Sequence, residues 1–270
     1  MWFKPTIKVV VVLVVVYALV VGLAWLFQRQ LIYLPSTESP EVFGDVSEIA
    51  LHTGDGLELA AWLVPPQKND RDTAVLVAPG NAGNRASRLP LARNLATEGF
   101  TVLLVEYRGY GGNPGTPDEA GLVQDAAAAS RYLRHEAGFD RIVYFGESLG
   151  GGVVSALATV DPPTGMLLRS PFTDLAAAGQ SAYPFLPVRA LLADRYPVVD
   201  NVVAAAVPLT VIVGTRDSTI PPQQSRDVAD AAAEAGVEVS VVDVDADHND
   251  ASLVHGPAVV QALVSLHDRV

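Results

Sequence analysis

The stretch RIVYFGESLGGG, residues 141–152, decides the fold. Residues 141–145 form a short apolar run that predicts a strand, and residues 149–159 predict a helix. Between them lies the pentapeptide Gly146-Glu147-Ser148-Leu149-Gly150. Its glycines permit the close backbone approach of a strained strand-to-helix turn, and the helix N-terminus favours developing negative charge. A bare G-x-S-x-G also occurs by chance in structural turns, but this context favours Ser148 as a nucleophile.

The segments around this turn alternate between strand and helix. Runs rich in Val, Leu and Ile predict strands at 73–78, 100–106, 141–145, 165–169, 208–213 and 237–243. Helix-length segments separate most of them, at 85–98, 117–136, 149–159, 221–235 and 251–269. An antiparallel hairpin is expected at 46–51 and 57–64, around the turn at 53–56. This order predicts an α/β fold with a mostly parallel sheet flanked by helices.

A serine hydroxyl needs a base to take its proton and an acid to orient that base. In the α/β-hydrolase fold, an Asp or Glu after a late strand and a His before the last helix follow the serine in sequence. Asp217, after the strand at 208–213, and His248, after the strand at 237–243, satisfy this order. We therefore predict a Ser148–Asp217–His248 triad.

Other residues compete for the two partner roles. His52 and His135 precede the serine, and His255 lies within the predicted last helix, so each fits the expected order less well. Several carboxylates are closer in sequence to His248 than Asp217 is, and we interpret them as one exposed acidic loop: Asp243, Asp245, Asp247 and Asp250. The spacing of this loop does not match a calcium-binding loop, and no metal-ligand set emerges elsewhere.

Acyl transfer also requires two backbone N–H donors for an oxyanion. The amide of Leu149, directly after the serine, is the first candidate. The loop 79–84 follows an early strand, and we choose the amide of Asn81 as the second. Gly80 and Gly83 are spaced as in a phosphate-binding loop, but the Lys and Ser/Thr of that motif are missing.

The first thirty residues form a separate unit. Residues 9–27 carry no charge and are close to the length of about 20 residues that crosses a membrane as a helix. A cleaved signal peptide is the alternative, but the run lacks a small-x-small cleavage site. Residues 1–30 are expected to form a single-pass anchor, with aromatic residues near its two ends: Trp2, Trp25 and Tyr33.

Charge around the anchor indicates its orientation. Lys4 and Lys8 precede the span, whereas Arg29 and then acidic residues follow it: Glu38, Glu41 and Asp45. This bias favours an N-terminus inside and a catalytic domain, residues 31–270, outside the cytoplasm. The net charge of −12 and the lack of a basic run exclude nucleic acid as a partner. The chain has no cysteine, which excludes disulfides and thiol nucleophiles.

Residues 171–207 break the strand–helix rhythm with prolines and aromatic residues, and we interpret them as a small cap inserted between two strands. Phe172, Tyr183 and Phe185 are its substrate-pocket candidates. An aromatic cap beside a membrane anchor indicates an apolar, lipid-like acyl substrate.

Taken together, the motifs resemble a family, the membrane-anchored α/β-hydrolases related to the yeast bud-emergence homologue and to mammalian short-cap abhydrolase-domain proteins. The matching segments are 30–35, 79–84, 107–111, 146–150, 170–173, 183–188, 214–217 and 248–250. The resemblance implies the same triad on an eight-stranded sheet with a small lid. The family usually has His where this chain has Pro79, which puts in doubt the support of the oxyanion loop.

The expected activity is hydrolysis of an acyl ester or thioester through an acyl-enzyme, without a cofactor. A peptidase or amidase of similar fold is an alternative, as is a non-catalytic membrane-tethered scaffold. The sequence leaves the natural substrate and the oligomeric state open.

Overall fold

A computed structural model describes residues 3–270 of the chain, and the side chains from Ile7 onward. The expectations placed on Trp2 and on the side chain of Lys4 lie outside these described residues. The centre of the fold is an eight-stranded sheet in the order β10-β9-β8-β7-β4-β6-β3-β2. The strands are β2 (Ser47–His52), β3 (Glu58–Val64), β4 (Thr73–Ala78), β6 (Thr101–Leu104), β7 (Arg141–Glu147), β8 (Gly165–Arg169), β9 (Leu209–Gly214) and β10 (Val239–Val244).

The sheet is mostly parallel, as the sequence predicts. Strands β6, β4, β7, β8, β9 and β10 run parallel, while β3 pairs antiparallel with both β6 and β2. The predicted hairpin is therefore confirmed. Parallel strands bring their carboxyl ends to one edge of the sheet, where β7 leads into Ser148, β9 into the Asp217 loop and β10 into the His248 loop.

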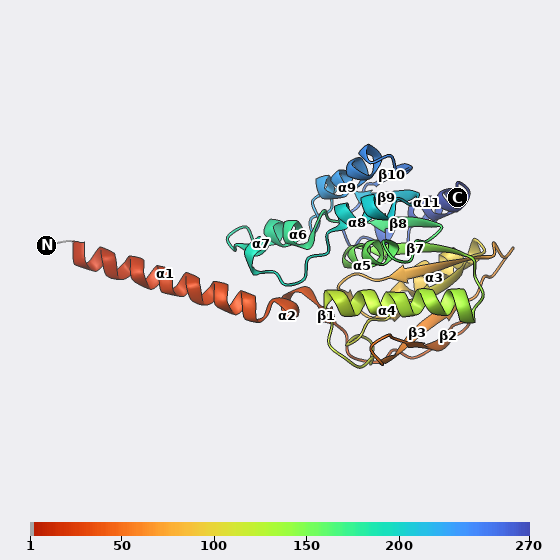
Figure 1. Ribbon diagram of the computed structural model, residues 1–270, viewed down its shortest axis with the longest axis horizontal. Helices are drawn as coiled ribbons and strands as arrows, with labels where there is room; N and C mark the ends of the chain where they lie inside the picture. The colour runs from red at the N-terminus through yellow and green to blue at the C-terminus, as the bar shows by residue number, and fades with distance from the viewer. Residues whose placement is uncertain (1–2) are drawn as a thin grey trace.

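Helices cover both faces of the sheet (Figure 1). One core joins the sheet to α4 (Glu119–Arg131), α5 (Leu149–Ala158), α8 (Val198–Ala205) and α9 (Pro222–Glu234). A second core lies on the opposite face, against α3 (Leu89–Thr97), α10 (Ala251–Val254) and α11 (Pro257–His267). Strand β4 shows why both faces are apolar. Its consecutive residues Leu76 and Val77 point to opposite faces and belong to different cores, and both are fully buried.

Three predicted helices differ in detail. The segment 85–98 begins as a 3₁₀ turn, η1 (Arg85–Arg88), before α3. The segment 117–136 ends in a π-helical turn, η2 (Tyr132–Glu136). The segment 251–269 divides into α10 and α11 at Gly256, where a side chain would have its Cβ 2.3 Å from the carbonyl oxygen of Ser252. Pro257 lacks the N–H that would continue α10 and instead starts α11.

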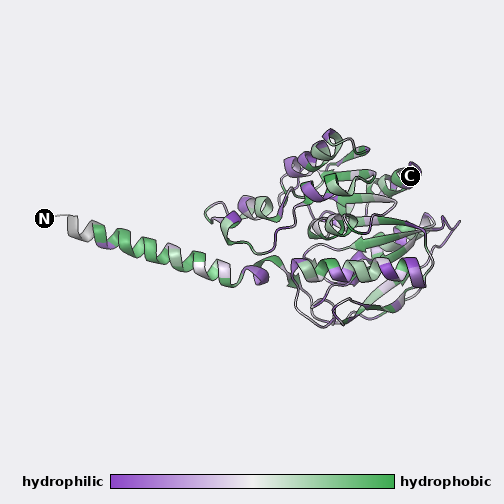
Figure 2. Cartoon of the chain, viewed as in Figure 1, coloured by the Kyte–Doolittle hydropathy of each residue, from purple (hydrophilic) through white to green (hydrophobic). Residues whose placement is uncertain are grey.

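The N-terminal helix α1 (Phe3–Leu26) projects from the body of the protein (Figure 1). Its segment Ile7–Leu26 is 20 residues long, and none of it is buried. In Figure 2 most of this helix has the green of hydrophobic residues. By length and composition it can cross a membrane, and a signal sequence would meet the same test.

A short helix, α2 (Gln28–Ile32), connects α1 to the sheet domain. It leads into β1 (Leu34–Pro35), which pairs in parallel with β5 (Ala82–Gly83) in the loop after β4. Of the segment expected as a cap, α6 (Leu175–Ala182) and α7 (Val188–Leu191) lie beside α1 (Figure 1). Helix α8 instead contributes Val198 and Val202 to the main core.

Candidate active site

Ser148 occupies the strained turn between β7 and α5. Its φ of 49° and ψ of −112° are unusual for a residue with a side chain, and its N–H donates to the carbonyl oxygen of Arg169 at 2.9 Å. The two glycines of the pentapeptide are required by contact distance. A Cβ on Gly146 would lie 2.6 Å from the Cα of Gly151, and one on Gly150 would lie 2.1 Å from a backbone carbonyl oxygen of β4.

Asp217 and His248 meet at the carboxyl end of the sheet. His248 Nδ1 and Asp217 Oδ2 are 2.7 Å apart, and both residues are buried. The other oxygen, Oδ1, accepts the backbone N–H groups of Thr219 at 2.9 Å and Ile220 at 2.8 Å. Burial opposes ionisation of Asp217, but the hydrogen bond and charge of His248 outweigh it and lower the pKa of the carboxyl. The hydrogen bond to Asp217 fixes the orientation of the His248 ring.

The carboxylates closest in sequence to His248 have other partners. Asp247 Oδ1 accepts the backbone N–H of His248 at 2.7 Å and that of Ser218 at 2.7 Å, so it orders the loop. Asp245 binds the guanidinium of Arg216 at 2.7 Å on the surface. Among these carboxylates, Asp217 is the one that contacts the imidazole ring.

The competing histidines lie elsewhere. His52 ends β2, the edge strand opposite β10. His135 lies in η2, and His255 follows α10. None of the three contacts Asp217 in the described chain, so the geometry favours His248.

A buried ion cluster joins the serine turn to the histidine loop. Glu147 Oε2 lies 3.1 Å from Arg88 Nε and 3.5 Å from Arg169 Nη2, and Arg169 Nη1 donates to the carbonyl oxygen of His248 at 2.9 Å. Burial opposes ionisation of Glu147, but the two guanidinium charges outweigh it and lower its pKa. Because Arg169 contacts both Glu147 and the His248 carbonyl, it sets the spacing of the two loops.

Within residues 3–270 no hydrogen bond joins Ser148 to His248. Hydrogen bonds of this kind often tighten only with substrate bound.

The loop after β4 lies against the serine turn. A Cβ on Gly80 would be 3.8 Å from the Cβ of Ser148, and the next residue, Asn81, lines the same cavity as Ser148. The backbone N–H of Asn81 has no acceptor among residues 3–270, and the amide of Leu149 opens α5, where helical N–H groups lack intrahelical partners. Two N–H groups are thus free to face an oxyanion.

The segment after the candidate membrane span, residues 28–35 and here called the juxtamembrane segment, holds Asn81 in place. Its side-chain Nδ2 donates to the carbonyl oxygen of Ile32 at 2.8 Å, and its own carbonyl oxygen accepts from the N–H of Leu34 at 2.9 Å and from the hydroxyl of Tyr110 at 2.9 Å. The segment after α1 thus supports the loop after β4 directly.

Pro79 stands where the family usually has His, yet its surroundings are ordered. Its carbonyl oxygen accepts a hydrogen bond from the buried Tyr107 hydroxyl at 3.0 Å. Burial raises the pKa of Tyr107 far above its usual value, so the hydroxyl stays protonated as a donor. A backbone contact therefore supports the loop at this position.

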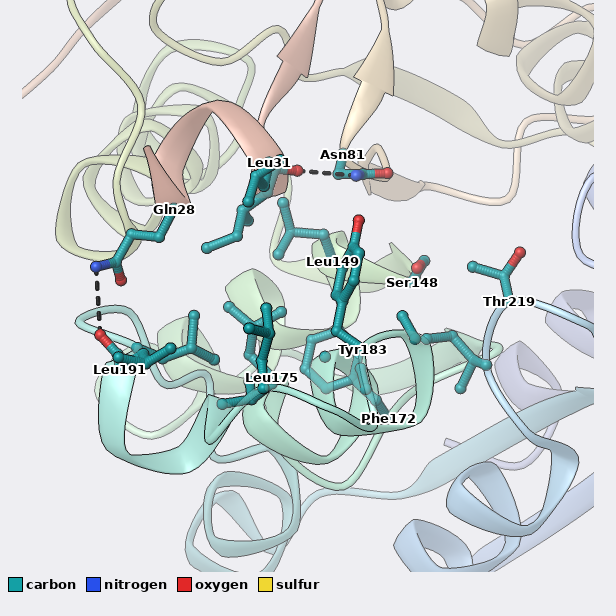
Figure 3. A pocket seen from close by; sticks show the side chains of 18 of the residues that line it. Gln28, Leu31, Asn81, Ser148, Leu149, Phe172, Leu175, Tyr183, Leu191 and Thr219 are labelled. Atoms are coloured by element: carbon teal, nitrogen blue, oxygen red, sulfur yellow. Dashed lines mark hydrogen bonds between the residues drawn. The ribbon is translucent and has the colours of Figure 1, made fainter. Parts of the chain in front are cut away.

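An apolar cavity of about 340 Å³ begins at Ser148 (Figure 3). Phe172 and Tyr183 line it, as predicted, together with Leu149 and residues of α6, α7 and the juxtamembrane segment. Phe185 does not line the cavity, contrary to our expectation. It is 61% exposed and packs edge-on to Tyr183, with ring centroids 6.4 Å apart, because the turn between α6 and α7 directs it outward.

Known proteins resemble this chain in sequence and in fold. The family model for the alpha/beta hydrolase fold matches residues 73–165. An uncharacterized protein of Mycobacterium tuberculosis is 41% identical over 261 residues, which cover 94% of this chain and 92% of the relative. The chain belongs to the α/β-hydrolase family.

Two further proteins resemble this chain, one in sequence and one in fold. Protein bem46 of Schizosaccharomyces pombe is 28% identical over 75% of this chain and 74% of its own length, which confirms the resemblance to the bud-emergence homologue. An esterase of Pyrococcus furiosus has the same fold, with a TM-score of 0.69 and 20% identity over 86% of this chain and 97% of the esterase.

Several site residues of this α/β-hydrolase could not be predicted from its sequence. Arg88 and Arg169 are separated from the serine motif in sequence, and nothing local indicates that they pair with Glu147. Leu31 and Ile32 of α2 line the cavity although the sequence assigned this region to the anchor boundary. The matching segment 30–35 was a usable signal, because such a motif directly after a span has a role beyond crossing the membrane.

Proposed function

We propose that this protein is a membrane-anchored serine hydrolase that cleaves acyl esters or thioesters. The observation that carries the proposal is the His248–Asp217 hydrogen bond of 2.7 Å at the same sheet edge as the strained Ser148 turn. Such an arrangement makes a serine hydroxyl nucleophilic.

The chemistry runs in two steps. His248 takes the hydroxyl proton as Ser148 Oγ attacks the acyl carbonyl, and Asp217 stabilises the imidazolium that forms. The N–H groups of Asn81 and Leu149 bind the oxyanion. The imidazolium then protonates the leaving alcohol or thiol. Water, deprotonated by His248, attacks the acyl carbon, the bond from that carbon to Ser148 Oγ breaks, and His248 returns the proton to Oγ as the acid leaves.

The substrate class follows from the cavity next to the serine. Its walls are mostly aliphatic and aromatic side chains, among them Leu149, Phe172 and Leu186. An acyl chain buries apolar surface there, whereas a peptide would leave most of its backbone groups without partners. This favours an ester or thioester of a lipid-like acyl group over a peptide substrate.

The location follows from α1, which the proposal treats as an uncleaved anchor. The juxtamembrane segment supports the oxyanion loop through the Asn81–Ile32 and Leu34–Asn81 hydrogen bonds. Cleavage of the chain close to this segment would weaken that support. The positive charge of Lys8 before the span favours a cytoplasmic N-terminus and an extracytoplasmic domain. Protease added from outside should digest the domain in cells whose cytoplasmic membrane is intact and whose cell wall or outer membrane has been made permeable. Full protection there, with digestion after lysis, would contradict this orientation.

The proposed reaction is tested with purified full-length protein in detergent. We expect hydrolysis of ester and thioester substrates of medium acyl length, little hydrolysis of the matching amides, and loss of at least a thousandfold in Ser148→Ala. Equal rates for wild type and Ser148→Ala would refute a serine hydrolase, and a preference for amides would replace it with an amidase.

A further inference from the structure

The turn between α6 and α7, residues 183–187, is here called the cap tip. It touches the membrane helix itself. The hydroxyl of Tyr17, within α1, donates to the carbonyl oxygen of Phe185 at 2.9 Å. Beneath this contact, Leu186 and Val188 of the cap pack with Val21 and Ala24 of α1 in one apolar cluster.

The position of Tyr17 places the cap tip at membrane depth. Tyr17 lies about 14 Å along the helix from Leu26, the end of the apolar segment, at 1.5 Å per residue. If α1 spans the hydrocarbon layer, a group bonded to Tyr17 lies below the membrane surface. Figure 1 shows this turn beside α1, on the side of the domain from which α1 emerges.

The composition of the cap tip fits such an environment. No charged residue occurs between Asp174 and Arg189. Tyr183 and Phe185 are 41% and 61% exposed, an unusual state for aromatic rings in water. Aromatic side chains in this arrangement are typical of segments that insert at a membrane interface.

The cavity runs from the serine to the place where α1, α2 and α7 meet. In Figure 3, Ser148 and Thr219 lie at one end, and Gln28 and Leu191 lie at the other. Gln28 joins α2 to the cap at that end, since its Nε2 donates to the carbonyl oxygen of Leu191 at 3.3 Å and its Oε1 accepts from the N–H of Ala193 at 2.7 Å. Ala24 of the membrane helix lines the cavity as well.

We propose that the cap tip inserts into the lipid leaflet and that the substrate is a membrane acyl lipid whose chain enters the cavity between the cap and α1. The chain reaches Ser148 without passing through water. This inference rests on the proposed function, because the acyl ester bond breaks by the same two-step acyl transfer, with water as the second substrate and a fatty acid as the product. The cavity volume of about 340 Å³ is at the lower end for ligand sites and suits one chain.

Charge at the entrance indicates the headgroup. Two cations are next in sequence to the cavity-lining residues Gln28 and Val188. They are Arg29, which pairs with Asp118 at 3.3 Å and Asp194 at 3.6 Å, and Arg189, which pairs with Asp174 at 3.2 Å. These cations are already neutralised, and the chain carries a net charge of −12. An uncharged or zwitterionic headgroup is therefore favoured over an anionic one.

Insertion is tested first, by a measurement independent of catalysis. The chain has no cysteine, so Phe185→Cys and Val160→Cys each provide one labelling site in the full-length protein. Val160 is the matched control, a 79% exposed apolar residue after α5, outside the cap. An environment-sensitive fluorophore at position 185 should shift to shorter wavelength in phosphatidylcholine vesicles and be quenched by nitroxide-labelled lipid, and one at position 160 should do neither. Equal, water-like emission from both positions would overturn insertion.

Substrate entry is tested with Phe185→Asp and Val160→Asp. For monoacylglycerol in phosphatidylcholine vesicles, Phe185→Asp should lower kcat/KM about tenfold or more, because the interface then takes up a charge in place of an apolar ring. On a short water-soluble ester both variants should match wild type. Equal loss on both substrates, or no loss on either, would overturn entry from the leaflet. A wild-type protein inactive on all esters would refute the proposed function, while the fluorescence result would still decide insertion.

Discussion

Replacing Asp217 with Asn tests whether the imidazole of His248 depends on a carboxylate. In the Asn variant the side-chain oxygen keeps its place, because it accepts the N–H groups of Thr219 and Ile220 at 2.9 and 2.8 Å. The amide nitrogen then faces His248 Nδ1 at the position of Oδ2, 2.7 Å away. A donor at that point requires Nδ1 to be unprotonated, which puts the ring proton on Nε2. The imidazole can then no longer accept the serine proton.

The size of the effect follows from these contacts. Turning the amide over to restore the correct tautomer would break two hydrogen bonds at about 1 kcal/mol each, roughly a thirtyfold loss. The missing carboxylate charge also removes electrostatic stabilisation of the imidazolium, which costs about ten- to a thousandfold. Together these effects predict a fall in kcat of about 300- to 30,000-fold.

The assay is steady-state hydrolysis of a chromogenic ester by full-length protein in detergent, with thermal unfolding as a check on folding. Asp247→Asn is the matched control, since that carboxylate orders the same loop through the backbone of His248 rather than through its ring. We expect the control to stay within a few-fold of wild type. If Asp217→Asn keeps more than a tenth of the wild-type kcat, or if Asp247→Asn falls as far, the assignment of the acid is wrong.

Two further variants probe the frame of the site. Glu147→Gln leaves the buried guanidinium of Arg169 and the partly buried one of Arg88 without a counter-charge and should lower the free energy of unfolding by about 3–5 kcal/mol at pH 7. The pKa of Glu147 is lowered in the folded state, so its contribution is present above the usual carboxyl range and is lost as pH falls through the lowered value. The difference between the two proteins, followed by urea unfolding, should therefore shrink in acid, and a difference independent of pH would contradict this reasoning. Gly150→Ala places a Cβ 2.1 Å from a backbone carbonyl oxygen and should cost about 1–3 kcal/mol in thermal unfolding together with most of the activity, whereas Gly151→Ala, with its nearest atom at 3.6 Å, should be milder in both. Similar losses in the two variants would argue against close packing at the turn.

Much of the fold was predictable because its signals are local. Residues 74–78 are all apolar, so both faces of the strand at 73–78 are apolar. Such a run predicts a strand buried between two helix layers, and β4 has these bounds in the structure. The serine pentapeptide lies between a strand and a helix, and the order of Asp217 and His248 follows from the parallel sheet. Each of these inferences uses neighbours in sequence or a general rule of chain topology.

The remaining features depend on contacts between distant segments. Arg169 ends a strand in an apolar sequence, and only the folded sheet shows that it bridges Glu147 and the carbonyl of His248. Phe185 resembles a pocket residue in sequence, but the turn that carries it packs against α1 and directs the ring outward. Composition indicates that a side chain is apolar, and it does not specify which apolar surface that side chain contacts.

The most direct test of the account is covalent labelling of full-length protein with a fluorophosphonate, followed by intact-mass and peptide analysis. A fluorophosphonate phosphonylates a serine that a base has activated, and oxyanion donors stabilise the charge that develops on the phosphonyl oxygen. The account predicts one adduct per chain, located on Ser148, with no adduct on Ser148→Ala and slow labelling of Asp217→Asn. Equal labelling of wild type and Ser148→Ala, or no labelling of a folded wild-type protein, would contradict it.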